Sequence, residues 1–116
     1  MLLISAAVLM TALAGKVDPG RLAAPEPIMP IPSLFAVSDY PADALAKRAQ
    51  GITDYRLRVG ANGRVDKCDI ERSSGNAALD AATCRVITKR SRFRPAVDEA
   101  GRPVASIYLG MIHWIL

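Results

Sequence analysis

Hydrophobic and polar positions alternate from residue 52 onward in a way that predicts a β-hairpin. In residues 52–59 (ITDYRLRV), apolar side chains take every second position from 55 and charged ones lie between them, which is typical of a strand with one solvent face. An Asn-Gly pair at 62–63 follows and is a strong signal for a tight turn. Residues 64–72 then form the return strand, with Cys68 and Ile70 on one face.

Apolar residues at helical spacing predict a helix on each side of this hairpin. The first spans residues 39–50, with Asp39 as its cap, Pro41 in its first turn and Gly51 at its end. Its inward face is expected to hold Ala42, Leu45, Ala46 and Ala49. The second spans residues 77–91, capped by Asn76 or Ser74. Its apolar stripe, which Cys84 borders, comprises Leu79, Ala82, Thr83, Val86 and Ile87.

The chain closes with an apolar segment, residues 104–116, which is long enough for one extended strand. The order helix, strand, strand, helix, strand predicts an α+β fold. In this fold a three-stranded antiparallel sheet carries two helices packed on one face. The folded part, residues 39–116, has roughly 75 to 80 residues, a size at which the core is marginal and a covalent crosslink would help.

The N-terminal residues differ in character from this domain. Residues 1–14 (MLLISAAVLMTALA) carry no charge and end in the small-x-small pattern of a signal-peptidase site. As a helix they would be about 21 Å long, short of the ~30 Å hydrocarbon core of a bilayer. We interpret them as a signal peptide; a short membrane anchor and a buried helix of a cytosolic protein are the alternatives. Residues 15–38 are predicted to be a Pro-rich linker with polyproline character.

The only two cysteines, Cys68 and Cys84, have 15 residues between them. Export would place them in an oxidising compartment, where two cysteines in a small domain most often pair. The chain-entropy model gives such a disulfide roughly 3 kcal/mol of stabilisation. Two buried thiols are the main alternative, since the spacing does not match the CxxC pattern of redox work.

Charge and candidate chemistry narrow the classes of function. The formal net charge is +4, and a basic cluster surrounds Phe93, formed by Arg85, Lys89, Arg90, Arg92 and Arg94. In a cytosolic protein such a cluster would suggest nucleic-acid binding, but export argues against that role. The remaining interpretations are a solvated helix end and a contact for an acidic partner. The single histidine, His113, has no recognisable nucleophile beside it, and Asp80 is a first-turn helix acid. We therefore predict no enzyme activity, no cofactor, no metal site and no nucleic-acid partner.

A series of short motifs between residues 39 and 116 resembles the C-terminal domain of TonB. They are, in order, Tyr40-Pro41, Gly51, Asn62-Gly63-Arg64-Val65, Ser73-Ser74-Gly75, Leu79-Asp80-Ala81-Ala82, Arg92-Phe93-Arg94-Pro95-Ala96 and Gly101-Arg102-Pro103-Val104. The resemblance implies a periplasmic domain of Gram-negative bacteria that binds the TonB box of outer-membrane transporters. Binding would occur by β-strand addition to the last strand. It also implies proton-motive-force-driven transport with ExbB–ExbD, if the chain is anchored in the inner membrane.

The resemblance also implies where a partner would bind. In the last strand the implied residues are Ser106, Ile107, Tyr108, Leu109, Gly110, Met111 and Ile112. Near the first helix they are Tyr40, Pro41 and Arg48. The alternatives are a protected or self-paired last strand, as in a homodimer, and a Tyr-Pro pair that only starts a helix. Because the apolar and Pro-rich runs are short for an energy transducer, the alternative function is a secreted periplasmic module with a structural or regulatory role in the envelope.

Overall fold

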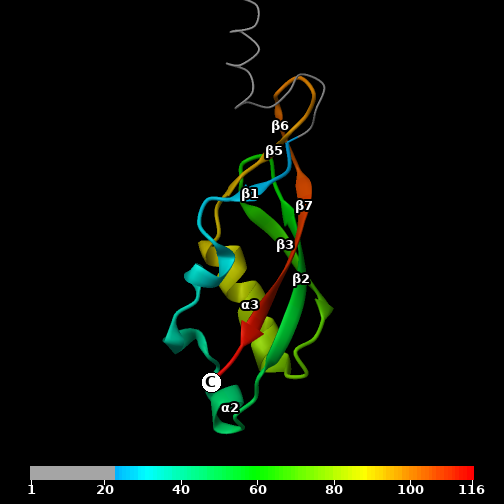
Figure 1. Ribbon diagram of the computed structural model, residues 1–116. Helices are drawn as coiled ribbons and strands as arrows, with labels where there is room; N and C mark the ends of the chain where they lie inside the picture. The colour runs from blue at the N-terminus through cyan, green and yellow to red at the C-terminus, as the bar shows by residue number, and fades with distance from the viewer. Residues whose placement is uncertain (1–22) are drawn as a thin grey trace, which may run out of the picture.

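The computed structural model describes residues 23–116, so the predicted signal peptide, residues 1–14, lies outside the described residues. The helices and strands are β1 (Glu26–Pro27), η1 (Ile31–Leu34), η2 (Val37–Asp39), α2 (Ala42–Ala46), β2 (Gly51–Val59), β3 (Val65–Arg72), α3 (Ala77–Arg90), β4 (Phe93–Arg94), β5 (Ala96–Val97), β6 (Pro103–Val104) and β7 (Ser106–Trp114) (Figure 1). Within this range, no helix has the length and apolar character needed to cross a bilayer.

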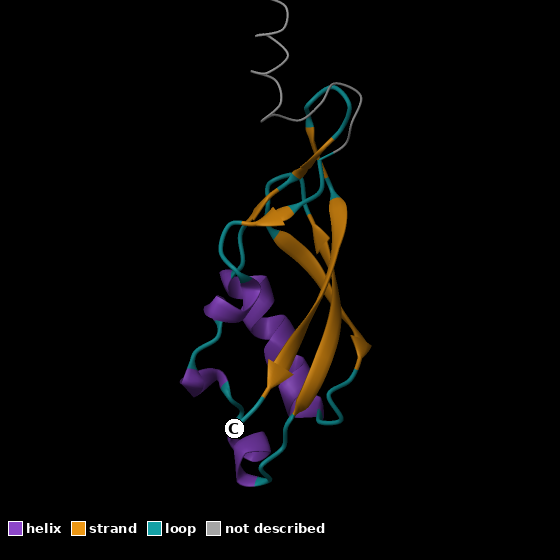
Figure 2. Ribbon diagram, in the orientation of Figure 1, coloured by secondary structure: helices purple, strands orange, loops and turns teal. Residues whose placement is uncertain are grey.

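The predicted α+β fold class is confirmed by a three-stranded antiparallel sheet in the order β3-β2-β7. The long helix α3 lies against one face of this sheet, and the shorter α2 lies at the end of the sheet where β7 finishes (Figure 2). Two small pairs of strands, β1–β4 and β5–β6, extend the structure at the other end. These pairs were not predicted, because strands of two residues leave no period to read.

The core forms between α3 and the central strand, as the periodicity predicts. The side chains of β2 that point inward and are buried are Thr53, Tyr55, Leu57 and Val59. Those of α3 are Leu79, Ala82, Thr83, Val86 and Ile87, the predicted stripe. The side chain of Asn76 caps α3 and accepts hydrogen bonds from the N–H groups of Ala78 and Leu79, at 3.0 and 3.1 Å.

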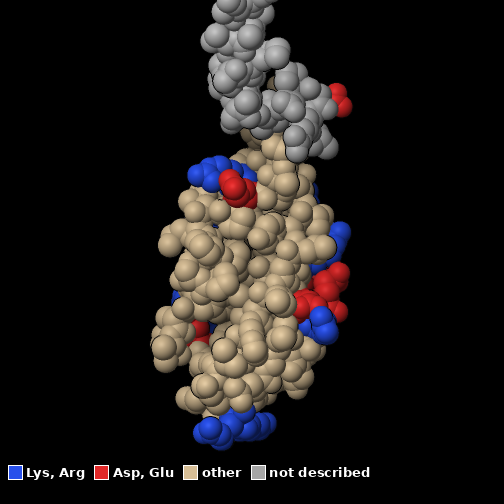
Figure 3. Space-filling view, in the orientation of Figure 1, with Lys and Arg blue, Asp and Glu red and all other residues tan. Residues whose placement is uncertain are grey.

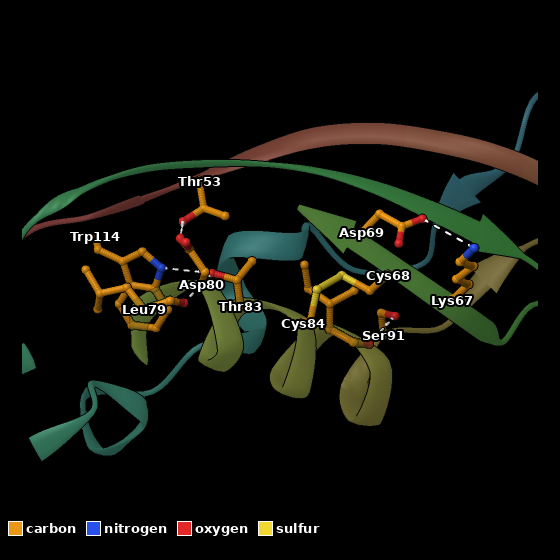
Figure 4. Close-up of a disulfide and its surroundings, with 11 residues drawn as sticks. Thr53, Lys67, Cys68, Asp69, Leu79, Asp80, Thr83, Cys84, Ser91 and Trp114 are labelled. Atoms are coloured by element: carbon orange, nitrogen blue, oxygen red, sulfur yellow. Dashed lines mark hydrogen bonds and ion pairs between the residues drawn. A yellow bond between two sulfur atoms is a disulfide. The ribbon is translucent and has the colours of Figure 1, made fainter. Parts of the chain in front are cut away.

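The two cysteines form a disulfide that joins the edge strand β3 to α3 (Figure 4). The Cα atoms of Cys68 and Cys84 are 5.6 Å apart, within the usual range for a disulfide. Cys68 faces the helix because it pairs across the sheet with Leu57, which is fully buried. The prediction of a disulfide is therefore confirmed, and the bond closes a covalent loop, residues 68–84, that contains the connection from β3 to α3.

The first helix is much shorter than predicted, because α2 ends at Ala46. Arg48 follows in the left-handed region, with a φ of 52°. The N–H groups of Arg48 and Ala49 donate to the carbonyls of Leu45 and Ala44, at 3.0 and 2.8 Å. This is a Schellman end with arginine at the position that glycine usually occupies. The predicted inward face was also wrong. Of its four residues, Ala42, Leu45 and Ala46 are exposed and only Ala49 is half-buried, whereas the buried residue of α2 is Ala44.

Part of the segment predicted as a linker lies along the domain. Residues 26–27 pair with β4, and the backbone of Ala23 bridges to that of Val97. Ile31 is only 3% exposed and belongs to the core cluster. The Pro-rich composition hides this packing because its apolar residues follow neither a helical nor a strand period. The division of the chain into a linker and a domain at residue 39 remains a prediction.

Asp80 joins three parts of the fold through its carboxylate. It accepts hydrogen bonds from the hydroxyls of Ser73, Ser74 and Thr53, and from the N–H of Ser74. Burial raises the pKa of Asp80, but the hydrogen bonds from Ser73, Ser74 and Thr53 outweigh it and hold the pKa below its usual value. The Ser-Ser-Gly and Leu-Asp-Ala-Ala motifs therefore serve the structure here: they fix the β3–α3 turn against β2.

We expect Asp80→Ala to destabilise the domain by about 1–2 kcal/mol at neutral pH, because the buried hydroxyl of Thr53 loses its acceptor. Since the pKa of Asp80 is lowered by folding, this stabilisation exists above the pKa of an unfolded aspartate and disappears as the pH falls through the folded value. Urea unfolding at neutral and acidic pH measures both effects. A difference between wild type and variant that grows on acidification would contradict this account.

Candidate functional site

One edge of the sheet is open along β7. Its nine residues pair with β2 from Ser106 opposite Val59 to Trp114 opposite Gly51. Among residues 23–116, no strand pairs with its other edge. In an antiparallel strand, alternate residues direct their N–H and C=O groups away from the partner strand. The outer edge of β7 therefore presents backbone donors and acceptors that an extended chain could pair with.

The side chains of β7 do little to protect this edge. On the open face of the sheet, Ile107, Leu109 and Met111 are 41%, 63% and 60% exposed. Proteins usually protect an exposed edge strand with charged residues, proline or a bulge. Here the same positions carry large aliphatic side chains, and β7 runs without a bulge against β2. The exposed row is therefore suited to contact with apolar side chains of a neighbouring strand.

Gly110, in the middle of β7, is required by the packing of its cross-strand neighbour Tyr55. A Cβ atom at this position would lie 2.4 Å from the Tyr55 hydroxyl oxygen and 2.6 Å from its Cζ atom. The pKa of Tyr55 is raised to about 12, mainly because the side chain is buried and secondly because Tyr108 lies nearby. Tyr108 in turn packs edge-on against Phe93, with ring centroids 5.0 Å apart. This half of β7 therefore packs closely against the core.

An apolar groove of about 690 Å³ lies beside the other half of β7. One side is formed by residues 111–116, and the other by Pro32, Phe35, Ala36, Val37, Tyr40 and Leu45. Its lining contains no Asp, Glu, Lys or Arg. Figure 3 shows the same character on a larger scale: charged side chains gather at the ends and along the two sides, and the middle of this face has none. The groove therefore favours an uncharged, apolar occupant.

Trp114 connects the groove to the core. Its ring meets those of Phe35 and Tyr40 edge-on, with centroids 5.4 and 5.2 Å away. Its Nε1 atom donates a hydrogen bond of 2.9 Å to the Thr83 hydroxyl on α3 (Figure 4). Phe35 and Trp114 were missed as groove residues because they are distant in the sequence and neither lies in a motif. An aromatic residue inside the Pro-rich segment was the one available signal.

The residues implied near the first helix have separate places. Tyr40 lines the groove, while its hydroxyl donates to the Ala49 carbonyl, so its position is fixed by the fold. Pro41 precedes α2 as its N-cap, and its carbonyl accepts the Leu45 N–H at 2.8 Å. Arg48 is exposed and lies outside the groove lining. The structure thus brings Tyr40 together with Met111 and Ile112, and leaves Arg48 apart from them.

Asp39 does not cap α2 as predicted. Its carboxylate pairs with Arg90 on α3, at 2.6 and 2.9 Å, and accepts the Ala36 N–H at 2.7 Å. The hydrogen bonds from Arg90 and then from Ala36 lower the pKa of Asp39 to about 2. Arg94 pairs similarly with Glu26, at 2.9 Å. Two members of the basic cluster therefore hold the N-terminal segment of the domain.

The fold and this site define a small α+β domain whose last strand has an open edge beside an apolar groove. The family model for the C-terminal domain of the Gram-negative bacterial TonB protein matches residues 36–116, so the chain belongs to that family. The solution structure of the Pseudomonas aeruginosa TonB C-terminal domain is similar in fold, with a TM-score of 0.59 and 21% identity. The match covers 81% of this chain and 88% of that one. Among curated proteins, none matches the chain.

Proposed function

We propose that this domain binds an extended segment, the TonB box, of an outer-membrane TonB-dependent transporter by β-strand addition to β7. The observation that carries the proposal is the unpaired, unprotected edge of β7 beside an apolar groove. Membership of the TonB C-terminal family supports this choice of partner. Binding, and not catalysis, is the role that such an edge serves.

The surfaces on the two faces of the sheet next to β7 indicate the chemistry of the bound segment. A strand added to β7 would place alternate side chains beside Leu109 and Met111 on the open face. The remaining side chains would point to the other face, where the groove continues past Ile112 to Trp114. The groove lining has no Lys, Arg, Asp or Glu, so we expect the side chains that point to it to be uncharged and apolar. On the open face, Leu109 and Met111 offer apolar contacts next to the added strand, while charged residues of β2 and β3 lie behind them. Backbone hydrogen bonds would supply much of the affinity.

We further propose that the domain acts in the periplasm and takes part in transport driven by the proton motive force through ExbB–ExbD. The disulfide fits an oxidising compartment. The alternative is a secreted module of the same fold with a structural or regulatory role in the envelope and no energy transduction. Cell fractionation, with the mass of the mature protein, separates the two, because coupling to ExbB–ExbD requires a chain held in the inner membrane.

Strand addition predicts a dependence on every second peptide bond of the ligand. The probe is a fluorescein-labelled synthetic peptide carrying the TonB box of a Gram-negative outer-membrane transporter, and N-methyl groups are introduced at one backbone nitrogen at a time. Methylation of nitrogens that face β7 should weaken binding roughly tenfold or more, since each removes a backbone hydrogen bond. Methylation of the nitrogens between them should have little effect. Fluorescence anisotropy measures each affinity.

The methylated peptides of the unaffected set serve as matched controls for the chemical change itself. Failure of the unmodified peptide to bind would refute the proposed partner. Equal losses at all positions would refute strand addition but leave peptide binding intact. A stable dimer through β7 that binds no peptide, seen by analytical ultracentrifugation, would instead favour the self-paired strand.

A further inference from the structure

One wall of the groove is a segment that we call the strap, residues 31–40. It contains η1 and η2, and the family match begins inside it, at residue 36. Ile31 is buried at its start and Tyr40 packs on Trp114 at its end. Between them Val37 is 96% exposed. Leu34 and Phe35 also pack against the core, so the exposed part of the strap beside the groove is residues 36–38.

Within the described residues, no backbone–backbone hydrogen bond joins the strap to the sheet or to α3. The N–H groups of Ser33 and Phe35 donate to Pro30 and Pro32, and those of Asp39 and Tyr40 donate to Ala36 and Val37. All four bonds are local and only shape the turns. The position of these turns relative to β7 therefore depends on side chains: on the apolar packing of the strap and on polar contacts from α3.

Arg90, at the end of α3, provides that link. Its Nη1 donates to the Leu34 carbonyl at 2.9 Å and to one Asp39 carboxylate oxygen at 2.6 Å. Its Nη2 donates to the other carboxylate oxygen at 2.9 Å. Asp39 in turn accepts the Ala36 N–H. One guanidinium group therefore holds both turns of the strap from the side facing α3, and it does not itself line the groove.

We propose that Arg90 is a positioning residue of the binding site: it fixes the strap and so sets the width of the groove beside β7. This inference rests on the proposed peptide binding. Without Arg90, the strap must be ordered at the moment the ligand binds, and the cost of that ordering is subtracted from the affinity. The planar fork of arginine suits the role, because a lysine ammonium cannot bind the carboxylate in the same bidentate way.

The position of the strap can be measured without any ligand. Trp114 is the single tryptophan of the chain and packs against Phe35 and Tyr40 of the strap. In Arg90→Gln we expect its emission to shift to the red and acrylamide to quench it more strongly, while circular dichroism shows a folded domain. Arg90→Lys should fall between wild type and Arg90→Gln. Lys89→Gln is the matched control, since it removes the same charge one residue away and Lys89 forms no ion pair within residues 23–116.

The same variants test the link to binding with the fluorescein-labelled TonB-box peptide. Arg90→Gln should bind it about tenfold more weakly, Arg90→Lys less so, and Lys89→Gln like the wild type. The alternating effect of N-methylation should persist in every variant, because β7 is untouched.

Each other result counts against a different statement. Unchanged Trp114 quenching in Arg90→Gln would overturn the role of Arg90 in fixing the strap. Altered quenching with unchanged peptide affinity would overturn its role in the binding site, with the proposed function intact. If the wild-type protein fails to bind the peptide, the proposed function and the binding role of Arg90 both fall, and the quenching still decides whether Arg90 fixes the strap.

Discussion

Replacing Trp114 with alanine should destabilise the domain by about 3–5 kcal/mol, the range for removing a large buried aromatic side chain. The ring is 5% exposed and contacts the rings of Phe35 and Tyr40. The other buried side chains of the described core are smaller than tryptophan, so we expect them to fill only part of the cavity that the substitution leaves. Urea unfolding followed by circular dichroism measures the loss, because the variant has no tryptophan fluorescence to follow.

Trp114→Phe separates the two contributions of this side chain. It keeps an aromatic ring against Phe35 and Tyr40 but removes the hydrogen bond from Nε1 to Thr83. The Thr83 hydroxyl retains its own bond to the Leu79 carbonyl, at 2.9 Å. We therefore expect a loss of about 1 kcal/mol from the hydrogen bond, plus a smaller packing term. If Trp114→Ala were as stable as Trp114→Phe, Trp114 would not be the core residue that the structure indicates.

Removing the disulfide should have the second large effect. For a loop of this length the chain-entropy model gives about 3 kcal/mol, within the range of about 2–5 kcal/mol seen for native disulfides of small domains. The test is the Cys68→Ala/Cys84→Ala double variant, compared with wild type by urea unfolding. Its expected loss is a large part of the stability of a domain of this size.

Reduction of the wild-type protein is the matched control for this variant. With a reducing agent present, the wild type should unfold near the midpoint of the double variant, and the variant should not respond to the reagent. Thiol titration of unreduced, denatured protein should find no free thiols. Two free thiols would contradict the disulfide, and equal stability with and without the bond would contradict its structural importance.

The three strands of the main sheet, α3 and the disulfide were predictable because their signals are local. Alternation along residues 52–59 assigned the buried side of β2, and Asn76 marked the start of α3 through its capping side chain. Cys68 and Cys84 lay on the two predicted faces that had to meet. The open edge of β7 followed from the position of the last strand at the side of the sheet, a matter of topology that the family resemblance supplied.

The shortness of α2 and the form of the strap were not predictable because long-range contacts decide them. Lysine, arginine, alanine and glutamine at residues 47–50 all favour helix, yet the chain turns back at Arg48 to enter β2. The hydroxyl of Tyr40 donates a hydrogen bond to the Ala49 carbonyl, which in a longer helix would have accepted a backbone N–H of the helix. The groove was missed for the same reason: its two walls are segments from opposite ends of the described chain.

The bridge between Ala23 and Val97 has a mechanical consequence for the proposed binding of a strand at β7. It places the start of the described chain at the β5–β6 end of the molecule, whereas the groove lies where β7 finishes (Figure 1). Tension between Ala23 and a ligand pulled past the groove would therefore act along the axis of β7. The hydrogen bonds between β7 and the added strand would then be loaded in shear, so they would share the force and break together. A pull perpendicular to β7 would instead break them one after another.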